Sequence, residues 1–281
     1  MVQRGTLLKQ KNKSISSLIY GGMAGCISRT CVAPFDKIKI LMQFQNSNLR
    51  FTKFFINNVK QEGILNMWKG NGTNLIRIFP FSGLQFMTYD LCKEVFLKDN
   101  RDTTTQERLL FGTISGVVAT TFTHPVDVLR HRLMCYPNIT SLRESAVDLY
   151  RENKFRGFFK GYGSTVVSLT PFIALNFTIF DCLKDKIPDH YDKTDSRLIL
   201  GMGAFSALIS QTACYPLDTI RRRMQNKTLN YKNGFEAGKV ILKTEGILSF
   251  YKGMLPNVLR MVPNTAIRFA IFDYLKDKFN Y

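Results

Sequence analysis

The sequence lacks a long hydrophobic run of the kind that marks a simple membrane span. Its longest uncharged stretches are Gly161–Phe180 and Leu198–Leu217, of twenty residues each, and Leu109–Val126, of eighteen. These lengths suit membrane-spanning helices of about 20 residues. Their content of Gly, Ser and Thr excludes helices that face lipid on every side. We therefore expect helices with one polar side, which faces a water-filled cavity.

Motifs for catalysis and for metal binding are also missing. The chain has three histidines, none in an HExxH sequence or with a histidine four residues away. His124 precedes Pro125 and is expected to be a pore or packing residue. The six cysteines form no CxxC pair and no cluster with metal-site spacing, so we expect reduced, buried thiols. With no phosphate-binding glycine loop and no GxSxG turn, we expect no enzyme, no metal and no cofactor.

Acidic residues are scarce relative to basic ones. Lys and Arg number 39 against 21 Asp and Glu, which gives a net charge of +18. Such an excess indicates an anionic partner: nucleic acid, acidic lipid, or a phosphorylated or carboxylated solute. Because the basic residues are spread over the whole chain and form no nucleic-acid motif, we do not expect nucleic acid to be the partner.

A threefold internal repeat organises the chain. Three motifs each occur three times, 91 or 92 residues apart: Pro-x-Asp-x-x-Lys/Arg, an aromatic-basic-Gly triplet, and aromatic-Asp-x-x-Lys. They begin at Pro34, Pro125 and Pro216, at Trp68, Phe159 and Tyr251, and at Tyr89, Phe180 and Phe272. Nine matches in register predict a single domain, residues 1–281, built from repeats at approximately 14–97, 105–188 and 195–281.

Each repeat predicts a long helix, a short amphipathic helix and a second long helix. The first long helix carries two small residues four apart, such as Gly21 and Gly25, a pattern that lets helices approach closely in a membrane. A proline lies inside each long helix and is expected to kink it. The middle segment ends in Glu-Gly in repeats one and three, whereas repeat two has Asn153-Lys154 there.

In these motifs and their spacing the chain resembles the mitochondrial carrier family over essentially its whole length. The resemblance implies an all-α membrane protein with six transmembrane helices in three pseudo-symmetric repeats around a central cavity, and short surface helices on the matrix side. It also implies a monomer that works by alternating access and contacts lipids such as cardiolipin. The implied location is the mitochondrial inner membrane or the membrane of a mitochondrion-related organelle.

The charged motif residues are expected to form two closable rings. An acid and a base three residues apart lie on nearly one helix face, so three such helices place them at one level. The resemblance implies a matrix gate of three ion pairs braced by two glutamines: Asp36–Arg130, Asp127–Arg221 and Asp218–Lys39, with Gln43 and Gln225. It implies a cytoplasmic gate of Asp90, Lys93, Asp181, Lys184, Asp273 and Lys276. At roughly 0–1 kcal/mol per pair, a ring could bias a two-state gate that substrate binding reverses.

Positions that break the threefold pattern are the candidates for binding an asymmetric solute. The resemblance places substrate contacts three residues before the even-helix prolines, at Arg77, Ser168 (with its neighbour Leu169) and Arg260. Arg29 and Arg268 have uncharged counterparts in the other repeats, so they add asymmetric cations. Because the arginine fork suits phosphate, we expect these six residues to bind a small anionic substrate.

Several segments, among them Asn71–Pro80 and Arg221–Gln225, resemble carriers of nucleotide-containing cofactors, which include the coenzyme A, ATP-Mg/phosphate and ADP/ATP carriers. The triple arginine is not followed by three methionines, unlike the ADP/ATP exchangers, and Ser168-Leu169 stands where adenine-nucleotide carriers have Gly-Ile. The expected function is therefore antiport of a nucleotide-type phosphorylated metabolite, such as coenzyme A, ADP/ATP or ATP-Mg/phosphate. The alternatives are a carrier of thiamine pyrophosphate or another small anion, and a proton-leak carrier.

Overall fold

A computed structural model describes residues 2–44, 50–97, 103–187, 196–226 and 231–278, and within these ranges all regular structure is helical. The α-helices are α1 (Val2–Phe44), α2 (Phe51–Glu62), α3 (Asn71–Phe96), α4 (Thr105–Cys135), α5 (Leu142–Gly157), α6 (Tyr162–Asp185), α7 (Ser196–Met224), α8 (Gly234–Glu245) and α9 (Met254–Lys278). Two short 3-10 helices, η1 (Leu65–Trp68) and η2 (Ile247–Tyr251), precede α3 and α9.

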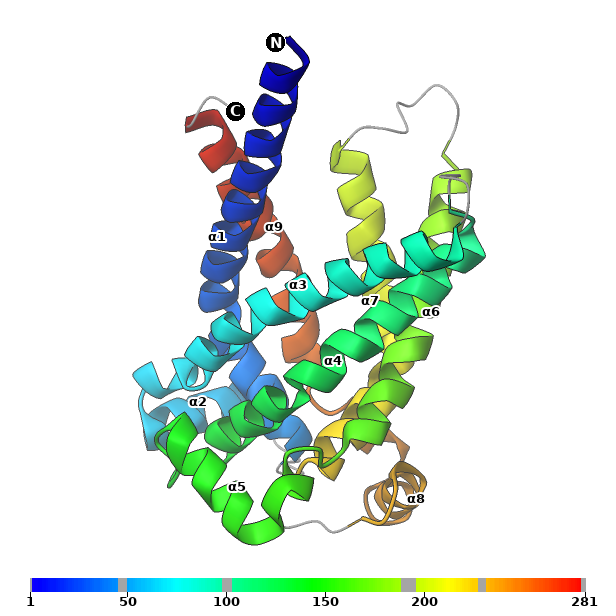
Figure 1. Cartoon of the computed structure of the whole chain (residues 1–281). Helices are drawn as coiled ribbons and strands as arrows, with labels where there is room; N and C mark the ends of the chain where they lie inside the picture. The colour runs from blue at the N-terminus through cyan, green and yellow to red at the C-terminus, as the bar shows by residue number, and fades with distance from the viewer. Residues whose placement is uncertain (1, 45–49, 98–102, 188–195, 227–230, 279–281) are drawn as a thin grey trace.

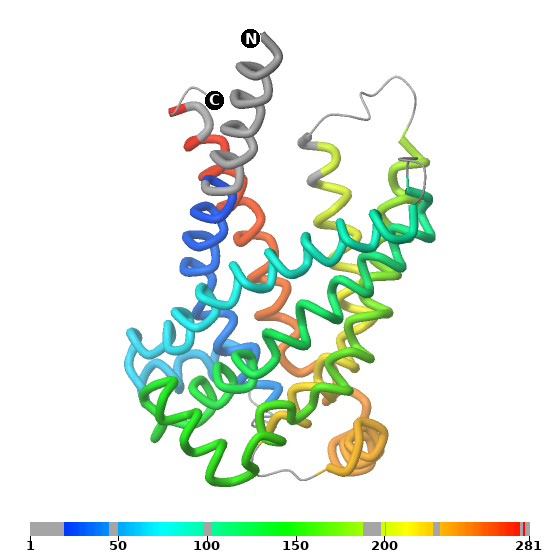
Figure 2. The backbone as a smooth tube through the Cα atoms, viewed as in Figure 1, coloured from blue at the N-terminus to red at the C-terminus, as the bar shows by residue number. Residues whose placement is uncertain are grey.

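The long helices pack mainly between repeats rather than within them. The most extensive contacts join α3 to α4, α6 to α7, and α9 back to α1, which closes the ring of six (Figure 1). The short helices α2, α5 and α8 lie together at one end, called here the matrix end (Figure 2). From there α9 runs to the opposite, cytoplasmic end. The predicted all-α architecture of three helix–short helix–helix repeats is confirmed.

The glycine of the aromatic-basic-Gly motif fixes where the second long helix of each repeat (α3, α6 or α9) begins. Gly70, Gly161 and Gly253 all have positive φ angles, of 82°, 75° and 83°, which favour glycine. A Cβ atom at Gly70 would lie 2.9 Å from Cγ of Met134, and one at Gly253 would lie 3.0 Å from a backbone oxygen of α1. The motif therefore turns the chain where it packs closely against the first long helix of the next repeat.

Ion pairs join each short helix to the first long helix of the same repeat. Arg223 of α7 makes a two-pronged contact with Glu245 of α8, at 2.7 and 2.8 Å. Arg132 of α4 contacts both Asp148 and Glu152 of α5, at 3.0 and 2.6 Å. Both arginines lie seven residues after the motif proline. Repeat one has leucine at that place, and its α1–α2 ion pair is made instead by Lys37, three residues after the proline, with Glu62.

The departure from Glu-Gly in repeat two leaves a strained residue. Lys154 has φ 48° and ψ −143°, while Gly63 and Gly246, at the corresponding places, have φ 82° and 79°. Lys154 thus adopts a backbone conformation that residues with a Cβ atom rarely occupy. Because Asn153 stands where the other repeats have glutamate, the ion pair with Arg132 is made by Glu152, one residue earlier.

Polar and apolar residues are distributed as a bilayer requires. Two of the described helices, α4 and α6, are long and apolar enough by composition alone to cross a membrane. Large apolar side chains are exposed on several long helices: Ile76, Phe79, Phe86, Phe122, Val167, Phe205 and Val262. In contrast, the charged groups of Asp36, Lys39, Asp127 and Arg130 are buried between the helices. Exposed apolar surface of this extent is typical of a membrane-facing protein.

Candidate functional site

Three ion pairs join the first long helices of the three repeats, α1, α4 and α7, near the matrix end. Arg130 of α4 contacts Asp36 of α1 at 3.3 Å, and Arg221 of α7 contacts Asp127 of α4 at 3.0 Å. Lys39 of α1 closes the ring on Asp218 of α7 at 2.8 Å. Each pair links a proline-motif acid to the base of the next repeat's motif, and the ring joins α1, α4 and α7 at this level.

Each acid of the ring also attracts a second cation from outside the predicted pairs. Arg260 Nη1 lies 2.9 Å from Asp36 Oδ1, and Arg77 Nε lies 3.1 Å from Asp127 Oδ1. Asp218 has Arg222 as its second partner, at 3.9 Å. The second long helices of repeats one and three, α3 and α9, are thereby tied to the ring through arginines that the sequence analysis assigned to substrate alone.

A polar pocket of about 240 Å³ lies against the ring. Its lining includes Ser168 and Leu169 of α6, Arg260 of α9, and Gln211 of α7, together with the ring residues Lys39, Asp218 and Arg221. Arg29 of α1 makes no ion pair with any described residue, and its charge lies within electrostatic reach of Arg77, Asp36 and Arg260. Four of the six predicted substrate residues from different helices are thus gathered near one place: Arg29, Ser168, Leu169 and Arg260.

A family model, mitochondrial carrier protein, matches the chain over residues 10–100, 101–191 and 197–281. The chain belongs to the mitochondrial carrier family. One curated relative, a probable envelope ADP,ATP carrier protein, chloroplastic, of Arabidopsis thaliana, is 36% identical over 265 residues, which cover 91% of this chain and 69% of that protein. Members of this family are transporters, so the chain is a multi-pass membrane carrier of small anionic solutes.

Two further relatives carry mitochondrial names. The mitochondrial adenyl nucleotide antiporter of Danio rerio is 30% identical over 274 residues, 92% of this chain and 57% of that protein. The mitochondrial carrier protein CoAc1 of Arabidopsis thaliana is 31% identical over 294 residues, 92% of this chain and 88% of that protein.

The remaining two predicted substrate residues of the carrier, Arg77 and Arg268, do not line the polar pocket. Arg77 is half-buried, with its guanidinium on Asp127 and 5.6 Å from the ring centroid of Phe81. Arg268 lies about two turns further along α9 than Arg260, where it lines a separate groove between α7 and α9. The structure therefore does not place Arg268 in the same pocket as Ser168 and Arg260.

The two glutamines do not brace the ion pairs of the carrier as the family resemblance implied. Gln43 Nε2 donates to Thr219 Oγ1 at 3.4 Å, and Gln225 Oε1 accepts from Arg222 Nη1 at 3.4 Å. Both side chains are buried beside a glycine of the aromatic-basic-Gly motif. A Cβ atom at Gly253 would contact Cγ of Gln43, and one at Gly161 would contact Cγ of Gln225. The braced arrangement is replaced by contacts to residues beside the pairs.

The ring of charges at the cytoplasmic end is not closed. Within the described ranges, no ion pair joins its members Asp90, Lys93, Asp181, Lys184 and Asp273 to one another. Asp90, Lys184 and Asp273 are exposed, and Lys93 lies 5.0 Å from the ring centroid of Tyr89 on its own helix. The side chain of Lys276 lies outside the described residues. The carrier is therefore paired at the matrix end, whereas the five described members of the cytoplasmic ring form no pairs with one another.

Arg222 is a site residue that the sequence analysis missed. It lines the polar pocket, contacts Asp218, and reaches the buried His131 of α4. Its counterparts six residues after the other motif prolines are Ile40 and His131, so it breaks the threefold pattern just as Arg29 does. The same asymmetry criterion, applied to the three consecutive arginines Arg221–Arg223, could have found it.

The side-chain expectations for histidine and cysteine hold in part. His124 is fully buried, and its ring nitrogen Nε2 lies 3.2 Å from the carbonyl oxygen of Lys160, as suits a packing residue. All six cysteines are free thiols, but Cys31 and Cys182 are exposed rather than buried. Both lie on long helices of the carrier, where a small apolar thiol can face lipid without an energetic penalty.

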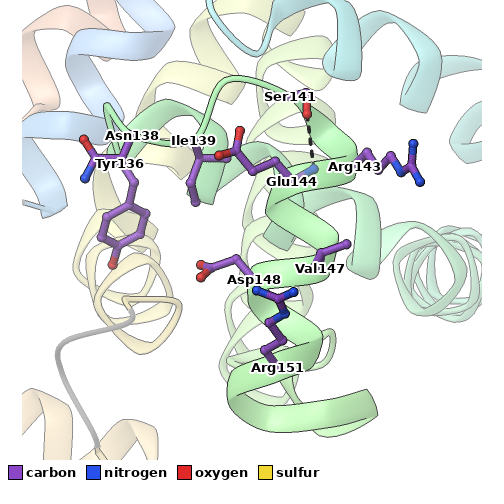
Figure 3. A pocket seen from close by; sticks show the side chains of 9 residues that line it. All are labelled: Tyr136, Asn138, Ile139, Ser141, Arg143, Glu144, Val147, Asp148 and Arg151. Carbon is purple, nitrogen blue, oxygen red and sulfur yellow. Dashed lines mark hydrogen bonds between the residues drawn. The ribbon is translucent and has the colours of Figure 1, made fainter.

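A second pocket, of about 550 Å³, lies on the surface beside α5 (Figure 3). Tyr136 and Asn138 flank one side, and Asp148 and Arg151 extend from α5 on the other. Two of its polar groups have partners within the protein: Tyr136 donates to Asn226 Oδ1 at 3.2 Å, and Asp148 binds Arg132. No predicted substrate residue lines this pocket, so the pocket at the ring remains the candidate substrate site.

Proposed function

We propose that this carrier exchanges a nucleotide-type phosphorylated metabolite, coenzyme A or an adenine nucleotide foremost, by alternating access. The supporting observation is the charge around the polar pocket. Seven cations gather there against the three ring carboxylates: Arg29, Lys39, Arg77, Arg130, Arg221, Arg222 and Arg260. A net excess of four positive charges at the closed end of a cavity favours a polyanion, because low-dielectric walls focus the field.

The shared arginines suggest how substrate opens the matrix gate. Arg77 and Arg260 are the second cations on Asp127 and Asp36. A phosphate group binds the same guanidinium forks and would compete with these carboxylates for them. Each acid then keeps a single cation, and the matrix ring is weakened. A substrate can shift a two-state equilibrium only by its differential affinity, and this competition supplies it.

The cytoplasmic ring completes the cycle in this proposal. When the matrix ring opens, Asp90, Asp181 and Asp273 would pair with the lysines of the same motif and close the other end. We propose that the carrier works as a monomer in the mitochondrial inner membrane or the membrane of a mitochondrion-related organelle. Lipid contacts, with cardiolipin as the leading candidate, would be made at the matrix end.

The test is counter-exchange by the purified carrier in liposomes. Vesicles loaded with ADP or coenzyme A should take up labelled ADP or coenzyme A only when the internal anion is present. Arg77→Ala and Arg260→Ala should each abolish exchange. Arg77→Lys keeps the charge but loses the planar fork, so it should restore only part of it. Arg143→Ala, an exposed arginine on α5 remote from the ring, is the matched control and should exchange normally.

The outcome against the proposal is equally definite. If the carrier moves amino acids or neutral solutes, and nucleotides neither enter nor compete, the nucleotide assignment fails. If thiamine pyrophosphate alone is exchanged, the carrier function stands and the substrate class changes.

A further inference from the structure

An apolar groove adjoins the polar pocket between α7 and α9. Its volume is about 630 Å³, and its lining is mostly small or apolar, with Gly203, Ala207 and Leu208 on α7 and Met261 and Phe269 on α9. Cavities of this size and character are typical of small-molecule sites. None of the ring residues lines it.

The groove and the polar pocket are neighbours along both helices. On α9, Arg260 lines the pocket, and Met261 and Asn264 line the groove. On α7, Gln211 lines the pocket and Leu208 lines the groove. Residues three to four positions apart are one helical turn, about 5.4 Å, from each other. A molecule bound at Arg260 therefore reaches the groove by extending about one turn toward the cytoplasmic end.

The groove exists because α9 does not cover the glycine-bearing side of α7. A Cβ at Gly201 would meet nothing within 4 Å, and one at Gly203 would meet only Phe180 of α6, at 4.0 Å. Both glycines line the groove. The small residues of α7 therefore leave open space on the side that faces α9.

Two polar groups on the α9 side of the groove lack partners. Asn264 Oδ1 is buried and accepts no hydrogen bond. Arg268, one turn further on, is exposed and makes no ion pair or hydrogen bond with any residue in the described ranges. A buried acceptor without a donor is costly unless a ligand satisfies it, and Arg268 offers a donor to the same ligand. One acceptor and one donor a helical turn apart match the N–H and C=O groups of an amide.

We propose that the groove holds an uncharged, amide-bearing arm of the substrate, whose phosphates lie at Arg77 and Arg260. This inference rests on the proposed function and narrows it. The chemistry is that of coenzyme A, in which a pantetheine arm with two amides extends from the pyrophosphate. ADP and ATP have no such arm and would leave the groove empty.

The test compares ligands with and without the arm on one purified protein. Affinities for coenzyme A, ADP and adenosine 3′,5′-bisphosphate are measured by ligand-dependent thermal stabilisation. Ala207→Phe fills the groove, and Asn264→Leu removes the buried acceptor. Ile209→Phe adds the same ring to α7 at an exposed position outside the groove lining, and it is the matched control.

We expect each groove variant to bind coenzyme A about tenfold more weakly, which corresponds to about 1.4 kcal/mol. ADP and the bisphosphate should bind all variants as they bind the wild type, which also shows that a variant is folded. The control should bind every ligand normally.

Three outcomes overturn the inference. Coenzyme A binding is unchanged in both groove variants, or the wild type binds ADP but not coenzyme A, or each variant that loses coenzyme A loses ADP equally. The last result would assign the groove to helix packing or to a lipid chain. In each case Arg77→Ala and Arg260→Ala still decide the proposed function separately, because they act on the phosphates that both ligands share.

Discussion

The two charged rings of this carrier arise from equally regular motifs, yet the structure treats them differently. At the matrix end, Asp36, Asp127 and Asp218 each have two cationic partners within 4 Å. At the cytoplasmic end, the described acids and bases of the ring stand apart, and three of them are exposed. Two rings that cannot close together are the requirement for alternating access. In this conformation the ion pairs that stabilise the closed state therefore lie at the matrix end.

The most severe way to break this comparison is to reverse one charge in the closed ring. Arg130→Asp places two carboxylates at Asp36 inside the protein. Leaving a buried charge without its partner costs about 3–5 kcal/mol. We expect liposome exchange to fall by about 100-fold or more.

The paired reversal serves as its control. Asp36→Arg combined with Arg130→Asp restores opposite charges and should recover part of the exchange. If the double variant is as inactive as Arg130→Asp, the pair does not act as a gate element.

Thermal stability offers a second comparison of the rings. Asp36→Asn leaves both Arg130 and Arg260 without a carboxylate and should lower the melting temperature by roughly 10 °C, given the cost of breaking a buried pair. Asp90→Asn removes an exposed, unpaired carboxylate and should change it by less than about 1 °C. Differential scanning fluorimetry in detergent measures both. Equal losses would show that the cytoplasmic ring is also paired in the resting carrier.

The repeat gave the architecture and the ring because both follow from residues that recur in register. An acid and a base at fixed places in three related helices lie at one level, and the family resemblance implied which acid meets which base. Departures from the threefold pattern were harder to predict. In repeat one, Lys37 makes the ion pair that an arginine four positions later makes in the other two repeats, and this is seen only when α2 lies beside α1.

The dual role of the substrate arginines lay beyond the sequence for a related reason. Arg77 and Arg260 precede their prolines by three residues, which marks them as cavity-facing but does not fix what they contact. Their reach to Asp127 and Asp36 depends on how far α3 and α9 lean inward. Likewise, the groove between α7 and α9 depends on packing distances, which small residues permit but do not impose.

A gentler change should strengthen the closed end. Lys154→Gly replaces the one described non-glycine residue with positive φ by the residue that repeats one and three have there. Relief of this strain should contribute about 1 kcal/mol, or roughly 2–4 °C in melting temperature. Lys154→Ala keeps the Cβ and should give no such gain. A stabilisation by alanine equal to that by glycine would locate the effect in the lysine charge rather than in the backbone.

The last prediction compares how the melting temperatures of a matrix-end variant and a cytoplasmic-end variant depend on pH. Burial acts to raise the pKa of Glu245, but its hydrogen bonds and ion pair with Arg223 outweigh burial and lower it below the ordinary value of 4.5. The contact therefore stabilises α8 fully above that value and loses its effect as pH falls through the lowered pKa. At pH 7, Glu245→Gln should melt about 2 °C below the wild type. The difference should shrink as pH drops below about 4.5, whereas the small difference between Asp90→Asn and the wild type should stay constant. A Glu245→Gln difference that persists at low pH would mean that shape, not charge, holds α8 to α7.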